Sequence, residues 1–346
     1  MKRRRPKPKQ RRGQTSAATT SPPASPPATP LLTTRGCMTM TITAGQVREL
    51  RERSGAGIMD CKEALAAEGG DIDAALDYLR KKGVSQAAKK SGRETREGAV
   101  AVCVDGDSAA LVELACETDF VARTTRFQEV VRDLARAAVA ARAKTPDELA
   151  EQSVGGVAVS DHIAAAVGEL GENLKLTRVA FIHSPGACFA SYIHNRYGDD
   201  LGRIGVLVAL SVDNNGDNEG DDNKGDDKNG AGAVSEFARQ LAMHVAAANP
   251  LAVDADSLDE KLVRHERDIQ REIAAEQNKP AEITAKIVEG KMRRFFKENA
   301  LLEQAWILDG DKSVGDALRE VETAAGGGVA VAAFVRFAIG EAGADA

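Results

Sequence analysis

The spacing of apolar residues changes at Gly98, and this change limits the chain to a mixed fold. Before it, residues 41–83 carry apolar side chains at helical intervals, interrupted by glycines. After it, residues 99–104 and 108–116 read as two strands, with residues 105–107 as the turn between them. Helical and strand patterns then alternate to the end of the chain. We therefore expect an α+β fold.

Three short helices are expected within residues 40–83. Thr43 and Gln46 form a capping-box pattern at the start of the first helix. Gly83 is expected to end the third helix as its C′ residue. A bundle this small resembles a ubiquitin-associated domain. Residues 84–97 then read as a polar connector.

Two α+β core subdomains with small antiparallel sheets are expected, over residues 98–185 and 186–346. The second contains residues 213–229, which hold seven acidic residues and two lysines among Asn and Gly. Without periodic apolar side chains, this stretch is expected to be a flexible acidic loop. Two apolar helical patterns joined by a short break predict an antiparallel helical hairpin over residues 256–298.

The net charge of −6 hides an uneven distribution. Residues 1–39 hold nine of the 46 Lys and Arg residues and no acidic residue. Removing those nine leaves 37 basic against 52 acidic residues, a net charge of −15 for the rest of the chain. Binding to a phosphate backbone depends on clustered cations, so the body favours a protein partner over a specific nucleic acid.

Residues 1–39 are rich in Pro, Ser, Thr and Ala and are expected to form a disordered extension. Three interpretations remain open: sequence upstream of a true start at Met38 or Met40, an organellar transit peptide, or a basic tail that touches RNA. We favour the first, because the prolines break a presequence helix. The expected location is the cytoplasm, or an organelle matrix if the extension is a transit peptide.

The sequence lacks the motifs of several enzyme and ligand-binding classes. It has no GxxxxGK[ST], GxSxG or HExxH pattern, so direct nucleotide binding and these enzyme classes are not expected. The five cysteines form no CxxC pair, and the five histidines are not spaced as zinc ligands. We expect no cofactor, no metal and no covalent chemistry. The longest apolar runs are also too short to cross a bilayer.

Residues 118–123 place a carboxylate and a large apolar ring together where a strand should end and a helix should begin. Two readings compete for Asp119 and Phe120. In the first, Asp119 caps the following helix and Phe120 packs beneath it. In the second, Phe120 is offered to a partner. The residue types alone favour the first reading.

Five motifs follow one another along the chain: Thr43–Leu65, Thr118–Arg123, Arg203–Val208, Ala242–Ala247 and Lys286–Met292. In this order they resemble the translation elongation factor Ts family, the nucleotide exchange factors of elongation factor Tu. The resemblance runs from about Thr41 to Gly340. It implies elongation factor Tu as partner, in its GDP-bound and nucleotide-free forms, and a protruding coiled-coil module for the helical hairpin.

The resemblance also implies roles for particular residues. The pair Asp119-Phe120 would project into the GTPase domain of elongation factor Tu, beside its magnesium and phosphate site. In the N-terminal bundle, Arg48, Arg51, Ile58 and Met59 would contact the same domain. His194 would lie near another domain of elongation factor Tu. Without the resemblance, the two arginines read as part of a solvated helix face and Met59 as a core residue. His194 then reads as a histidine with a structural role. At the turn itself, the residues that the resemblance implies are Thr118, Asp119, Phe120 and Val121.

Other functions remain open on the sequence. A protein-interaction adaptor would use the N-terminal bundle, and an RNA-binding accessory protein would use residues 1–39 with the connector 81–96. A thiol enzyme would need Cys61 or Cys116, which lie in apolar runs typical of buried cysteines. His244, among Ala242, Met243 and Val245, is expected to be a buried histidine with its hydrogen bonds satisfied.

Overall fold

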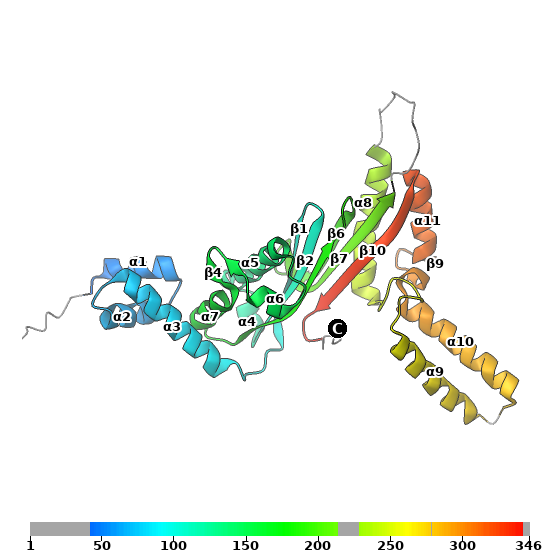
Figure 1. Ribbon diagram of the computed structural model, residues 1–346, viewed down its shortest axis with the longest axis horizontal. Coiled ribbons are helices and arrows are strands. Elements are labelled where there is room, and N and C mark those ends of the chain that lie inside the picture. Colours follow the sequence, from blue (N-terminus) through cyan, green and yellow to red (C-terminus); the bar gives the residue numbers. More distant parts are fainter. Residues whose placement is uncertain (1–41, 214–227, 278, 342–346) are drawn as a thin grey trace, which may run out of the picture. The chain divides into compact units, whose positions relative to one another are not determined.

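The computed structural model describes residues 42–213, 228–277 and 279–341 (Figure 1). The predicted extension over 1–39 and almost all of the predicted acidic loop over 213–229 lie outside these residues. In the described part, helices and antiparallel strands are mixed, which confirms the predicted α+β class. None of the described helices combines the length and the apolar character needed to span a membrane.

The N-terminal bundle consists of α1 (Ala44–Ser54), α2 (Ile58–Ala67) and α3 (Ile72–Lys90). Thr43 and Gln46 form the predicted capping box, in which each side chain bonds the backbone N–H of the other residue. The apolar spacing turns one face of each helix inward. The fully buried residues of this small core are Leu50, Cys61, Ala64, Leu65 and Ala75.

Gly83 does not end α3, contrary to the sequence-based expectation. The helix continues to Lys90, and Gly83 is buried where α3 packs against α7 (Val159–Leu170). A Cβ at Gly83 would lie 3.1 Å from the backbone oxygen of Ala164, and one at Gly168 would lie 3.5 Å from Gly83 Cα. The glycine therefore serves a close helix crossing rather than a cap, and the connector begins after Lys90.

The first α+β part follows the predicted hairpin. β1 (Glu97–Asp105) pairs with β2 (Ser108–Cys116) in full antiparallel register, and β2 pairs with β5 (Leu174–His183). Figure 1 shows α5 beside this hairpin, where its apolar face builds the largest core cluster of the described residues. The remaining elements are α4 (Asp119–Ala122), α5 (Thr125–Ala141), α6 (Pro146–Ala150), β3 (Ser153–Val154) and β4 (Val157–Ala158).

The second part contains the long strand β7 (Leu201–Asp213), which pairs with β6 (Cys188–Arg196) and β10 (Gly328–Ala338). The helix α8 packs over β6 and β7, and α11 packs against α8 and β10. The helices α9 and α10 form the predicted antiparallel hairpin, packed through Ala274, Val288 and Met292. The remaining elements are α8 (Lys228–Ala248), α9 (Glu260–Ala275), α10 (Ala281–Asn299), η1 (Leu301–Glu303), β8 (Ala305–Trp306), β9 (Asp309–Ser313) and α11 (Val314–Ala325).

The six longer strands of the two parts join in one sheet rather than in two, while β3 pairs with β4 and β8 with β9 in separate small sheets. The path runs β10-β7-β1-β2-β5, with β6 on β7. The link is short: Val100 pairs with Gly202 and Ala101 with Leu201. It is made by Leu201 and Gly202, the first two residues of β7. Local periodicity carries no information on such a long-range pairing.

His244 lies inside the second part, as predicted for a buried histidine with satisfied hydrogen bonds. Only 1% of the residue is exposed. Its Nε2 lies 2.9 Å from Gln304 Oε1, and its Nδ1 accepts the Ile307 backbone N–H at 3.3 Å. The ring stacks on Trp306 at a centroid distance of 5.3 Å. Since the Ile307 N–H can only donate, the neutral ring carries its proton on Nε2.

Replacing His244 by Phe should lower stability by about 1–3 kcal/mol for each hydrogen-bonding group left unpaired. Burial lowers the pKa of His244, although the Gln304 bond opposes this. The folded chain therefore resists protonation, and the stability from this site is present above about pH 6.5 and lost as the pH falls below that value. The difference in urea unfolding free energy between the native chain and His244→Phe should narrow from pH 7.5 to pH 5. A difference that stays constant or widens would contradict this assignment.

Candidate partner-binding site

The turn between β2 and α5 is a single helical turn with its own cap. Thr118 is the N-cap of α4, and its Oγ1 accepts the Val121 N–H at 3.4 Å. Thr124 donates its hydroxyl to the Val121 carbonyl at 2.8 Å and caps α5 by accepting the Phe127 N–H. One of the two sequence readings required Asp119 to cap the following helix. The cap of α5 is Thr124 instead, so that part of the reading is wrong. Two threonines leave the Asp119 carboxylate available.

Phe120 points away from the core, with 80% of the residue exposed. Its neighbour Ala122 is fully buried, and Val121 packs partly against the core cluster. One helical turn has one inward face, and these two residues occupy it. The reading in which Phe120 packs beneath the turn is therefore wrong. Phe127, seven residues later, shows the opposite arrangement with no exposed surface.

Asp119 lies at the surface beside a cation. Its Oδ2 is 3.5 Å from Arg123 Nε, and 45% of the Asp119 side chain is exposed. The Arg123 guanidinium also lies 5.4 Å from the centre of the Tyr197 ring, near the start of β7. An ion pair this exposed is weak, so Asp119 can exchange its partner at small cost.

Two glutamates fix the backbone at the start of the turn. Glu172 accepts the Thr118 backbone N–H at 3.0 Å and the Thr118 hydroxyl at 2.6 Å. Glu117 accepts the backbone N–H of Asn173 at 2.7 Å, and this bond is the main cause of the lowered pKa of Glu117. The two pairs of consecutive residues thus bind each other reciprocally; we call Glu117, Thr118, Glu172 and Asn173 the 117–172 clamp. Sequence analysis missed Glu172 and Asn173, because no local pattern marks a contact over more than 50 residues.

Cys116 supports the same turn and is not a reactive thiol. Its Sγ donates to the Thr118 carbonyl at 3.1 Å. Burial, with a smaller contribution from Glu172, raises the pKa of Cys116 to about 12. Cys61 is also fully buried. A nucleophilic cysteine needs an accessible thiolate, so neither residue is suited to thiol catalysis.

The four candidate residues of the N-terminal bundle are exposed. Met59 is 74% exposed and Ile58 56% exposed, at the first turn of α2. The reading of Met59 as a core residue is therefore wrong. Arg48 and Arg51 lie on α1, where Arg48 forms an exposed pair with Glu52 at 2.9 Å. Two adjacent exposed apolar side chains next to arginines suit a protein interface.

His194 lies on another element, β6. Its ring is exposed, and its Nδ1 lies 3.2 Å from the Tyr192 hydroxyl. Within the residues that the structure describes, no hydrogen bond or ion pair joins His194 or the four bundle residues to the turn 118–121. The candidates thus lie on different elements, namely the turn 118–121, the helices α1 and α2, and β6. A partner would have to be large enough to touch them separately.

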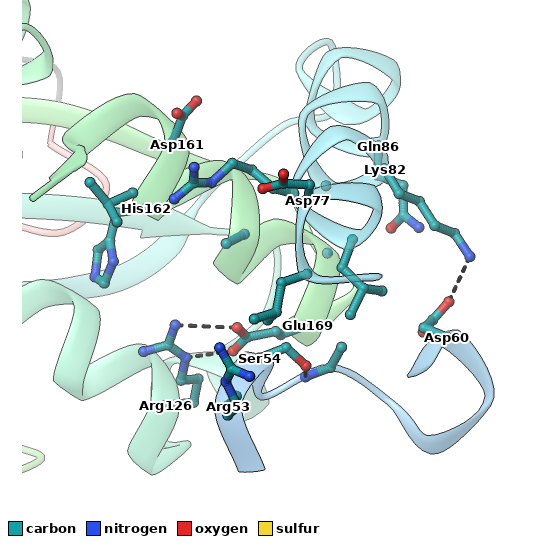
Figure 2. Close-up of a pocket in the computed structure, with 18 of the residues that line it drawn as sticks. Arg53, Ser54, Asp60, Asp77, Lys82, Gln86, Arg126, Asp161, His162 and Glu169 are labelled. Atoms are coloured by element: carbon teal, nitrogen blue, oxygen red, sulfur yellow. Dashed lines mark hydrogen bonds and ion pairs between the residues drawn. The ribbon is translucent and has the colours of Figure 1, made fainter. Parts of the chain in front are cut away.

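A pocket of about 450 Å³ is lined by α1–α3, α5 and α7 (Figure 2). Several of its charged side chains pair with each other, among them Arg126 with Glu169 (Nη2–Oε1, 3.3 Å) and Lys82 with Asp60 (2.8 Å). His162 also lines it, and burial together with the charge of Arg126 lowers the His162 pKa. Paired charges of both signs make this pocket a structural seam between the bundle and α7. Among the described residues, no group of three or more His, Cys, Asp or Glu side chains could hold a metal ion.

Known proteins of one family resemble this chain. The family model described as Elongation factor TS matches residues 117–341, a range that begins at the clamp. The chain is 44% identical over 302 residues to "Elongation factor Ts" of Agrobacterium fabrum, covering 87% of this chain and 93% of that protein. It is 45% identical over 304 residues to "Elongation factor Ts" of Beijerinckia indica, covering 87% and 92%. For the protein of the same name from Rhodopseudomonas palustris, the values are 44% over 304 residues, 87% and 93%. The chain belongs to the elongation factor Ts family of translation elongation factors.

Proposed function

We propose that this chain is a guanine nucleotide exchange factor that binds elongation factor Tu·GDP and promotes GDP release by inserting the Asp119-Phe120 turn near the magnesium and phosphate site. One observation carries the proposal: Phe120 is 80% exposed on a turn whose backbone is held by hydrogen bonds on both sides. An exposed large ring on a braced turn is costly in water unless a partner covers it. The acidic net charge and the family membership support a protein partner.

The proposed mechanism is physical displacement. A GTPase of this kind holds its nucleotide through phosphate-loop amides, a lysine and Mg²⁺. A ring inserted between two elements of that domain moves them slightly and weakens the contacts to Mg²⁺ and phosphate. Burying Phe120 on insertion supplies roughly 1.5–3 kcal/mol toward this movement. Asp119, exposed next to it, can orient the turn or compete for groups around the metal.

Exchange then follows from linkage between two ligands of one protein. If the factor weakens the binding of GDP, then GDP weakens the binding of the factor by the same free energy. Couplings of this type are typically about 1–3 kcal/mol. The chain forms and breaks no covalent bond in this scheme, and GTP binding displaces it in turn. We place this activity in the cytoplasm.

The second surface, Arg48, Arg51, Ile58 and Met59, is proposed to hold the GTPase domain while the turn acts on it. Separate surfaces allow affinity and release to be changed independently. His194 is proposed as a weaker contact to another domain of elongation factor Tu. An adaptor without exchange activity would also use the bundle, but it would leave the rate of GDP release unchanged.

Replacing Met59 by Asp should raise the concentration of this chain needed for half-maximal GDP release by about tenfold or more. The rate at saturation should stay near the native value, because the turn 118–121 is intact. Stability should change little, since Met59 is 74% exposed. A matched control is Leu308→Asp, an apolar residue 55% exposed that has no assigned contact. Equal half-saturation concentrations for Met59→Asp and the control would exclude the bundle from the interface.

A further inference from the structure

The 117–172 clamp has a chemistry that ordinary loop packing does not need. Both oxygens of Glu172 are used on one residue, Thr118, through its backbone N–H and its hydroxyl. A hydrogen bond to an ionised carboxylate is roughly twice as strong as a neutral one. Two of them on the residue that begins α4 fix both the backbone and the side chain of Thr118. Phe120 is only two residues away.

The clamp is also anchored on its far side. Asn173 is 5% exposed, and its Nδ2 donates to the Arg93 carbonyl at 2.9 Å. Glu117, bonded to the Asn173 N–H, lies 3.3 Å from Arg93 Nη1. The start of the turn is thus tied to the connector before β1 and to the loop that follows α7. A displacement of Phe120 would have to break bonds to two other segments.

Glu172 contributes little to the core itself. It follows Gly171, which ends α7 at φ 77, and lies half-buried in the loop before β5. Glu172 is not among the residues that form the main core cluster. Its hydrogen bonds are directed at Thr118, the first residue of the candidate site. This carboxylate is therefore placed to hold the turn 118–121 in a fixed conformation.

We propose that Glu172 is a positioning residue for nucleotide exchange: its carboxylate holds Thr118 so that the Phe120 ring is already ordered when the partner arrives. A loop that must be ordered on binding loses part of its interaction free energy to that ordering, and a pre-ordered loop does not. The inference rests on the proposed exchange function. It extends the site from residues 118–121 to a residue of the α7–β5 loop.

The test replaces Glu172 by Gln in the full chain and measures release of fluorescent GDP from elongation factor Tu. The amide offers one acceptor oxygen where the carboxylate offers two and carries no charge. The rate at saturation should fall about tenfold, equivalent to about 1.4 kcal/mol, and the half-saturation concentration should change by less than about twofold. Thr118→Val, which removes the hydroxyl partner, should lower the same rate. Glu298→Gln, which removes the exposed ion pair with Arg294 on α10, is the matched control.

A second measurement separates positioning from a general loss of structure. In a Phe120→Ala background there is no ring to position, so adding Glu172→Gln should slow release by less than about twofold further. An equal slowing in both backgrounds, or a native rate for Glu172→Gln alone, would overturn the inference. If Phe120→Ala releases GDP slowly and Glu172→Gln releases it at the native rate, only the positioning role of Glu172 is rejected. A native rate for Phe120→Ala removes the exchange proposal, and with it the role of Glu172.

Discussion

Replacing Phe120 by Ala should slow the release of labelled GDP from elongation factor Tu by about 10- to 1000-fold at saturating chain. The lower end follows from the lost burial of one ring, roughly 1.5–3 kcal/mol, or a factor of about 10–150 in rate. The upper end includes the loss of the displacement that the ring imposes on the phosphate site. Rapid mixing with fluorescent GDP measures both the native and the variant rate.

The variant is informative because it should leave the fold unchanged. Phe120 is 80% exposed and has no place in the core cluster, so the unfolding free energy should shift by no more than about 0.5 kcal/mol. Val104→Ala is the matched control, since Val104 is an exposed apolar residue on the hairpin β1–β2. A slow Phe120→Ala beside a native Val104→Ala would assign the effect to this ring.

Replacing Phe127 by Ala should have the opposite signature: a large loss of stability. Phe127 is fully buried at the start of α5 among residues of β1 and β2. Removing a buried ring loses its transfer free energy and leaves a cavity, together about 3–5 kcal/mol. Chemical denaturation followed by circular dichroism measures the loss. Phe127→Leu, which keeps most of the apolar volume, should lose clearly less.

The two phenylalanines thus form an internal comparison, seven residues apart in one segment. The proposal requires that Phe120→Ala slows GDP release and leaves the unfolding free energy nearly unchanged. Phe127→Ala should mainly lower the unfolding free energy. If Phe127→Ala were as stable as the native chain, the position of α5 on the sheet would be wrong. If both variants lost stability equally, Phe120 would be part of the core, against its exposed position.

Local patterns were enough to predict most of the elements. Alternation over 99–116 predicted the β1–β2 hairpin, and the Thr43 capping box marked the start of α1. These features depend on residues close together in the chain, so they are visible in the sequence. The burial of His244 was also predictable, because its neighbours in the sequence are apolar.

Features that depend on distant contacts were not predictable. Gly83 resembles a helix end in sequence, but its role is decided by α7, which begins more than 70 residues later. The joining of the six longer strands in one sheet depends on two residue pairs between β1 and β7. The exposure of Phe120 depends on which residues of a single helical turn find space inward. Glu172 could not be recognised, because its partner Thr118 lies 54 residues away.

The central claim is that the Phe120 ring leaves water and enters the partner, and fluorine NMR tests it most directly. A 4-fluorophenylalanine placed at position 120 should show a solvent isotope shift between H₂O and D₂O in the free chain, as its 80% exposure requires. With nucleotide-free elongation factor Tu bound, the account predicts that this isotope shift disappears. An isotope shift of unchanged size in the complex would contradict the account, because the ring would still be in water.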